Sequence, residues 1–219
     1  MKARDYLEPR LRLSTYFVLG TELRYLKLSD EDMLKLSKIL TIDRWGIVMI
    51  RPGLIHSAYR HNSIHVIDQL DLMNAELAIA LGRLDVLEHY ASKGYNMSNN
   101  QIGLMNVAII HGNLDAVKFL DRYPTNYDVR MMSYQASAYD HIHILEYFNV
   151  QYDARHLEIA VRNGHPSLVS YLIENGVSPS QSLAKYAIRT GEPEVIRLLK
   201  EYGIEFDAQT FEDAKYAWY

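Results

Sequence analysis

The stretch 157–176, LEIAVRNGHPSLVSYLIENG, most constrains the fold because it predicts two short helices joined by a tight turn. Its first half places Leu157 and Ala160 on one helical face. Its second half carries an apolar stripe at helical spacing: Leu168, Val169 and Leu172. Gly164 and Gly176 can take the left-handed conformation that ends each helix. Neither helix can bury its apolar face alone, so the pair requires neighbours of the same kind.

The same spacing of apolar, small and turn residues recurs along the chain, at 75–94, 105–124, 133–152 and 184–203. A less regular copy, which we call the eroded copy, begins near residue 55. In each copy a small residue, expected where the paired helices approach most closely, precedes the turn residue by four positions. These alanines are Ala78, Ala108, Ala136, Ala160 and Ala187, and the turn residues are Gly82, Gly112, Asp140, Gly164 and Gly191. The second helix of each pair is expected to bury an apolar residue, namely Leu120, Phe148, Leu172 or Leu199. In the eroded copy Ala58 precedes Asn62 in the same way.

The combination of alanine, Gly-His turn, Val/Ile pair, Leu pair and helix-ending glycine resembles the ankyrin repeat. That resemblance implies an all-α fold, an ankyrin-like helical repeat solenoid. The turn-to-turn spacings of 20, 30, 28, 24 and 27 residues are shorter than the roughly 33 of an ankyrin unit. Two helices and a turn use about 20 residues, so the β-hairpin fingers should be short or missing. The Thr-Pro-Leu-His start is absent, and such stripped repeats look similar to those of large DNA viruses and intracellular bacteria.

Three segments are expected. Residues 1–50 form an N-terminal capping or docking segment, in which Ser29 and Asp32 have capping-box spacing at a helix start. Residues 51–206 hold the ankyrin-like repeats. Residues 207–219 form a C-terminal half-repeat cap, in which Phe211 takes the position of Leu157. The alternative for that end is an exposed aromatic docking surface made of Tyr216, Trp218 and Tyr219.

Composition and charge exclude several classes of functional site and indicate the cellular compartment. A net charge of −4 argues against a surface dominated by nucleic-acid binding. The absence of cysteine excludes disulfides, thiolate metal sites and cysteine nucleophiles. The apolar run near the N-terminus is interrupted by Arg10 and Arg12, so it does not read as a signal peptide. No apolar run has the length of a membrane span. We expect a soluble, cytoplasmic protein without a membrane partner.

Motifs of catalysis and metal binding are missing from the sequence. It has no Gly-x-Ser-x-Gly, Walker-type loop, Gly-x-Gly-x-x-Gly or His-Glu-x-x-His, which predicts that the chain is not an enzyme and needs no cofactor. His61 and His65 are four apart, but they straddle a predicted helix break. His141 and His165 each follow a turn residue, where the ankyrin pattern places histidine for local hydrogen bonding. No metal site is therefore expected.

The alanine, turn and leucine positions are similar in every copy of the repeat, whereas the two residues just before each turn differ from copy to copy. We call these the pre-turn residues. They are Arg60, His61, Ala80, Leu81, Ile110, His111, Ala138, Tyr139, Arg162, Asn163, Arg189 and Thr190. In the ankyrin family these positions lie on the concave surface and commonly contact partners, so we expect all of them except the two alanines to bind a partner. None is acidic, and the apolar middle with arginines at the ends is typical of an interface core and rim. The alternative is that they are ordinary solvated helix ends.

The sequence thus favours a non-catalytic protein–protein interaction module, an adaptor or an inhibitor. Its partner should present an acidic surface patch. The viral and bacterial resemblance favours a virus or pathogen factor that acts on a host protein. The alternative function is a nucleic-acid-associated factor. It would use the concave arginines together with residues 1–27, where six side chains are basic and three are acidic.

Overall fold

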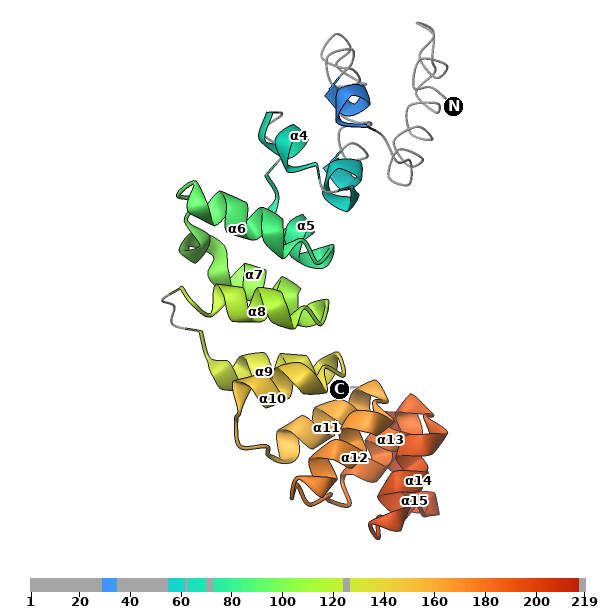
Figure 1. The fold of residues 1–219 in the computed structure, drawn as a ribbon. Coiled ribbons are helices and arrows are strands. Elements are labelled where there is room, and N and C mark those ends of the chain that lie inside the picture. Colours follow the sequence, from blue (N-terminus) through green and yellow to red (C-terminus); the bar gives the residue numbers. More distant parts are fainter. Residues whose placement is uncertain (1–28, 35–54, 62, 70–72, 124–126, 217–219) are drawn as a thin grey trace, which may run out of the picture. The chain divides into compact units, whose positions relative to one another are not determined.

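The computed structural model describes residues 29–34, 55–61, 63–69, 73–123 and 127–216. All regular structure in these residues is helical, which confirms the all-α prediction for this part of the chain (Figure 1). The chain divides into two compact units, residues 1–95 and 96–219, and each is described by itself. None of the helices in these ranges combines the length and apolar character that crossing a bilayer demands.

The unit of residues 1–95 contains short helices at 30–34 and 55–60, followed by α4 (Ile64–Gln69), α5 (Ala75–Ala80) and α6 (Leu84–Ser92). The unit of residues 96–219 begins with a short 3-10 helix, η2 (Met97–Asn100). Its α-helices are α7 (Gln101–Ile110), α8 (Leu114–Leu120), α9 (Val129–Ala138), α10 (Ile142–Phe148), α11 (Ala154–Asn163), α12 (Pro166–Glu174), α13 (Leu183–Thr190), α14 (Pro193–Glu201) and α15 (Ala208–Tyr216).

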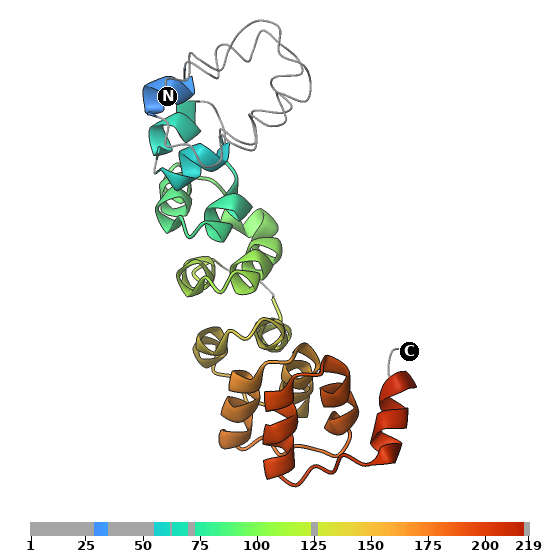
Figure 2. The same ribbon diagram turned by 90° about the vertical axis from the view of Figure 1, so that its right-hand side faces the viewer.

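The helices come in pairs joined by two or three residues, namely α5–α6, α7–α8, α9–α10, α11–α12 and α13–α14. In 96–219, the first helix of each pair packs against the first helices of adjacent pairs: α7 with α9, α9 with α11, and α11 with α13 (Figure 2). The last helix, α15, packs against α13. All of these helices have ten residues or fewer, below the length that is stable alone, so packing between pairs must hold them.

The predicted turn residues adopt the predicted conformation. Their φ angles are +69° at Gly82, +66° at Gly112, +61° at Asp140, +70° at Gly164 and +68° at Gly191. Asp140 is tolerated because aspartate, with its short polar side chain, reaches the left-handed region more easily than most residues. Each of these turns therefore reverses the chain within two or three residues, which lets the two helices of a pair pack together.

All but one of the predicted core positions are confirmed. The five alanines that precede the turns are fully buried, and so is Ala58 of the eroded copy. In the second helices Leu120, Leu172 and Leu199 are fully buried, whereas Phe148 is half-buried at the last position of α10. Small side chains on the first helices and leucines on the second thus make the contact within and between pairs.

At three of the turns, the residue that follows the turn residue bonds to the preceding pair. Arg83 donates from Nη1 to the carbonyl of Tyr59 in the unit of residues 1–95. In the other unit, His141 Nε2 lies 3.2 Å from the carbonyl oxygen of Ile110, and His165 Nε2 lies 2.9 Å from that of Ala138. The sequence predicted local hydrogen bonds for these two histidines. The bonds instead cross from one pair to the one before it, and they satisfy carbonyls at the ends of the first helices.

The predicted N-terminal segment 1–50 and the C-terminal segment 207–219 are described only in part. The helix at 30–34 begins as predicted, because the Asp32 amide donates to Ser29 Oγ at 3.1 Å. Ser63 Oγ donates to Asp30 at 2.6 Å, so this helix is attached to the first helix pair. Most of the predicted 1–50 segment lies outside the described residues, as do Trp218, Tyr219 and the Tyr216 side chain.

Phe211 has the predicted register of Leu157 but not its burial. Phe211 lies on α15 and is 53% exposed, whereas Leu157 is almost fully buried. Leu157 is enclosed by the helices on either side of α11, and within the described residues no further helix follows α15. Ala214, four positions before the expected turn, is nevertheless buried against its neighbours.

Candidate functional site

The pre-turn residues lie at the ends of the first helices, and most are accessible to a partner. Arg60, His111, Arg162, Asn163 and Thr190 are exposed, and His61, Leu81 and Arg189 are half-buried. Two apolar members are exposed as well, Ile110 at 37% and Tyr139 at 43%. Arg60, His61 and Leu81 belong to the unit of residues 1–95, and the others belong to the unit of residues 96–219.

Several of these residues meet in one pocket of about 470 Å³, which crosses the first helices α9, α11 and α13. It is lined by Ala138, Ile159, Arg162, Asn163, Tyr186, Arg189 and Thr190. The structure therefore brings together Arg162, Asn163, Arg189 and Thr190 from the predicted partner-binding set. Ile110, His111 and Tyr139 do not line this pocket, although they hold the same register in earlier pairs.

Two residues of the pocket, Ile159 and Tyr186, were not predicted from the sequence. Each lies three residues before a pre-turn arginine, Arg162 or Arg189, and so shares its helical face. That spacing could have identified both residues once the arginines had been chosen. The aliphatic and aromatic side chains give the pocket an apolar floor beside its two guanidinium groups.

Arg162 is held in place on two sides. Its guanidinium carbon is 4.9 Å from the centre of the Tyr186 ring, and its Nη1 is 3.2 Å from Glu158 Oε1. The Lys185 ammonium is also 4.9 Å from the Tyr186 ring centre. A cation over an aromatic face is attracted by the electron-rich ring, so Tyr186 concentrates positive charge at this end of the pocket.

The neutral polar residues of the pocket are bonded to their own helices. Asn163 Nδ2 donates to the Ile159 carbonyl at 2.8 Å, and the Thr190 hydroxyl lies 2.9 Å from the Tyr186 carbonyl. Both bonds run to the carbonyl of the residue four positions earlier in the same helix. These bonds use the Thr190 hydroxyl proton and one of the two N–H groups of Asn163, so the arginines supply most of the donors that a ligand would meet.

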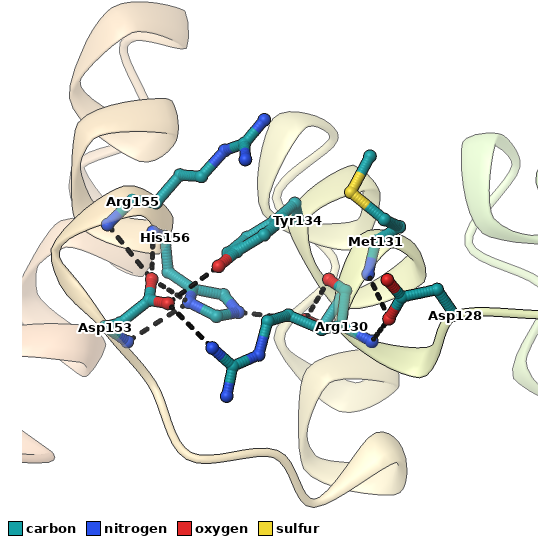
Figure 3. Close-up of polar contacts among 8 residues, drawn as sticks. Asp128, Arg130, Met131, Tyr134, Asp153, Arg155 and His156 are labelled. Atoms are coloured by element: carbon teal, nitrogen blue, oxygen red, sulfur yellow. Dashed lines mark hydrogen bonds and ion pairs between the residues drawn. The ribbon is translucent and has the colours of Figure 1, made fainter.

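A second polar cluster lies between α9 and α11 and has the order of a Ser–His–Asp triad (Figure 3). Ser133 Oγ is 2.9 Å from His156 Nε2, and His156 Nδ1 is 2.9 Å from Asp153 Oδ1. In hydrolases that order activates the serine for attack on a carbonyl. Here Ser133 and His156 are both 0% exposed, and the serine hydroxyl donates to the Arg130 carbonyl at 2.7 Å. A substrate cannot reach this oxygen.

The same cluster has a structural explanation. Asp153 caps α11 by accepting from the amides of Arg155 and His156, and it also accepts from Tyr134 Oη at 2.7 Å. Burial lowers the pKa of His156 below its ordinary value. Burial alone would raise the pKa of Asp153, but hydrogen bonds from Tyr134 and His156 outweigh it and lower this pKa to about 2. The cluster therefore ties the start of α11 to α9.

No sequence motif had marked this cluster, although one signal was present. Asp153 and His156 have the spacing of a helix cap and its third residue, and the structure forms a capping box from them. The contact to Ser133 joins residues 23 positions apart, and only the packed fold shows it. Among the residues in the described ranges, no three histidine, aspartate or glutamate side chains are grouped as metal ligands.

Comparison with known proteins gives no further assignment: no family model matches this chain, and no curated protein sequence matches it.

Proposed function

We propose that this chain is an ankyrin-like helical repeat solenoid with short or missing fingers, and that it acts as a non-catalytic protein-binding module. Three regularities support the repeat architecture. A left-handed residue occupies the expected turn of five pairs, a fully buried alanine precedes it by four positions, and hydrogen bonds run from one pair to the preceding one. The expected turn residue of the eroded copy, Asn62, lies outside the described residues. The links between the pairs of residues 96–219 hold no strand in the ranges that the structure describes.

The observation that carries the binding function is the pocket across α9, α11 and α13. It is built from pre-turn side chains of three successive pairs, together with Ile159 and Tyr186. Arginine and aromatic residues are enriched where protein interfaces bind most tightly. The exposed side chains of Ile110 and Tyr139 add apolar surface in the same register of α7 and α9. This mixture suits a protein partner with an acidic patch beside apolar residues.

Such a partner would be bound by an adaptor or inhibitor whose binding residues sit on short helices packed on both sides. A surface that is ordered before binding loses little conformational freedom when the complex forms. The non-catalytic part of the proposal is supported by the burial of Ser133 in the triad-like cluster. A host protein is the partner that the resemblance to viral and bacterial repeats favours.

The proposal is tested by affinity capture with the full chain from an extract of its native cell. The double variant Arg162→Glu with Arg189→Glu reverses the charge of the pocket. Arg197→Glu is the matched control, because Arg197 is as exposed as Arg162 (54% against 51%) and also pairs with a glutamate four positions away. We expect a partner that the wild type and the control recover and that the double variant recovers at least about tenfold less. Equal recovery by all three would contradict the proposal.

The alternative function is nucleic-acid binding through the same arginines. The basic residues of segment 1–27 lie outside the described ranges, so the support for it is the positive charge of the pocket. If this alternative is correct, the chain should bind DNA or RNA with an affinity that falls steeply as the salt concentration rises, and the double charge-reversal variant should not bind. A gel-shift titration at several salt concentrations distinguishes the two functions.

A further inference from the structure

We infer that the pocket across α9, α11 and α13 recognises one carboxylate side chain, aspartate or glutamate, that stands next to an apolar residue of the partner. This inference rests on the proposed protein-binding function and specifies the chemistry of its site. Three properties of the pocket support it: its charge, its hydrogen-bond donors and its size.

The charge of the pocket matches one carboxylate. Arg162 and Arg189 line it, and no lining residue is acidic. Lys185 adds a cation over Tyr186, and Glu158 pairs with Arg162. Glu192 also lies close by, since its Cβ is 3.5 Å from the position that a Cβ on Gly164 would take. A single carboxylate suits this charge, whereas a phosphate dianion would place a second negative charge beside Glu158 and Glu192.

The donors of the pocket favour a charged acceptor over a neutral one. Thr190 and one N–H of Asn163 bond to helix carbonyls, so the charged guanidinium groups supply most of the remaining donors. Arg162 uses one N–H of its five in the bond to Glu158. The Tyr186 ring and Glu158 together restrain the plane of this guanidinium. A guanidinium held in a fixed plane presents two parallel N–H groups, which match both oxygens of a carboxylate.

The size of the pocket explains the apolar neighbour. Its volume of about 470 Å³ lies in the range of small-ligand pockets, roughly 300–1,000 Å³, and exceeds what one carboxylate side chain fills. The remaining wall is formed by Ala138, Ile159 and the Tyr186 ring. An apolar side chain next to the acid would cover this wall and exclude water from the ion pair, which strengthens it.

The inference is tested by selecting a phage-displayed library of random peptides on the full chain. We expect the enriched sequences to share an aspartate or glutamate beside an apolar residue. A synthetic peptide of the enriched sequence should lose at least about tenfold in affinity when its acid is changed to the amide, or when the chain carries Arg162→Gln with Arg189→Gln. It should bind the Arg197→Gln control like the wild type. The change from acid to amide leaves the protein intact, so the test holds even if the double variant is poorly folded.

Four results would overturn the inference. They are enriched peptides without an acid, an affinity that is indifferent to the amide, binding that survives loss of both arginines in a folded variant, and tighter binding when phosphoserine replaces the acid. The selected peptides could bind the arginine variants like the wild type but bind the Ile110→Ala or Tyr139→Ala chains more weakly. That result would support the proposed binding surface and contradict the carboxylate site. If no sequence is enriched, both fall.

Discussion

At the scale of single residues, Gly112 shows two separate reasons for a missing side chain. Its φ of +66° is a conformation that residues with a Cβ rarely adopt. A Cβ there would also stand 2.7 Å from Cε1 of His141, whose ring is held by the bond to the Ile110 carbonyl. Gly176 has a similar backbone, with a φ of +91°, but nothing lies within 4 Å of a Cβ placed there.

These two glycines make a matched pair of variants. Gly176→Ala should cost about 1 kcal/mol through backbone strain alone. Gly112→Ala should cost more, because the His141 ring must move and its hydrogen bond, about 1 kcal/mol, is weakened. Denaturant unfolding of the full chain measures both free energies. Equal losses would show that His141 does not occupy the place that the structure gives it.

The buried cluster of His156 and Asp153 should make stability depend on pH. The pKa of His156 is lower in the folded state, so the unfolded state binds more protons as the pH falls below the ordinary histidine value near 6.5. Stability is thus highest above pH 6.5 and declines below it. The pKa of Asp153 is about 2, so a further loss follows as the pH falls from about 4 toward 2.

The His156→Gln variant should lose the decline between pH 7 and 5, because glutamine does not titrate. The control is His111→Gln, at a histidine that is exposed and lies outside the cluster. Thermal unfolding measured at closely spaced pH values compares the slopes. A His156→Gln chain whose stability declines as steeply as that of the wild type would contradict the assignment.

At the scale of helices, side-chain caps stabilise the starts of several first helices, and buried apolar residues hold the second helices in place. Several first helices begin at an aspartate or asparagine that accepts from the amides of the first turn, namely Asn74 for α5, Asp128 for α9 and Asp153 for α11. Among the second helices, Asn113 caps α8 in the same way, whereas α6, α10, α12 and α14 begin without a side-chain cap and are held by buried apolar residues. In α12 these are Leu168, Val169 and Leu172, all fully buried.

Leu172→Ala should therefore cost about 2–5 kcal/mol, because it opens a cavity in a core that cannot collapse fully. Ile173→Ala is the control, since Ile173 is the next residue of the same helix and is only half-buried. Its cost should be clearly smaller. A loss at residue 173 as large as that at residue 172 would mean that α12 is rotated about its axis relative to the structure.

Sequence reasoning succeeded for the helix pairs wherever a local pattern carried the information. The spacing of alanine and turn residue was enough to predict the burial of Ala160 and the left-handed turn at Gly164. Prediction failed where the answer depended on distant neighbours. The contact of Ser133 with His156 joins two pairs, and Phe211 is exposed although its register matches that of Leu157.

At the scale of the molecule, the candidate site exists because equivalent positions of successive pairs converge. Arg162 and Arg189 are 27 residues apart in the sequence, yet both line one pocket with Ala138 of the pair before them. The sequence located these residues through their shared register, but it could not show which ones meet. That Arg60, His61 and Leu81 of the other unit serve the same partner stays a prediction.

The proposed function depends above all on the ends of the first helices forming the binding surface. Hydrogen–deuterium exchange of the full chain, with and without the partner recovered by capture, measures whether they do. We expect binding to slow exchange at the turn amides that follow α9, α11 and α13, around residues 139–141, 163–165 and 190–192, and to leave the exposed face of α12 and α14 unchanged. Slowed exchange confined to α10, α12 and α14, with those turns unaffected, would contradict the proposed surface.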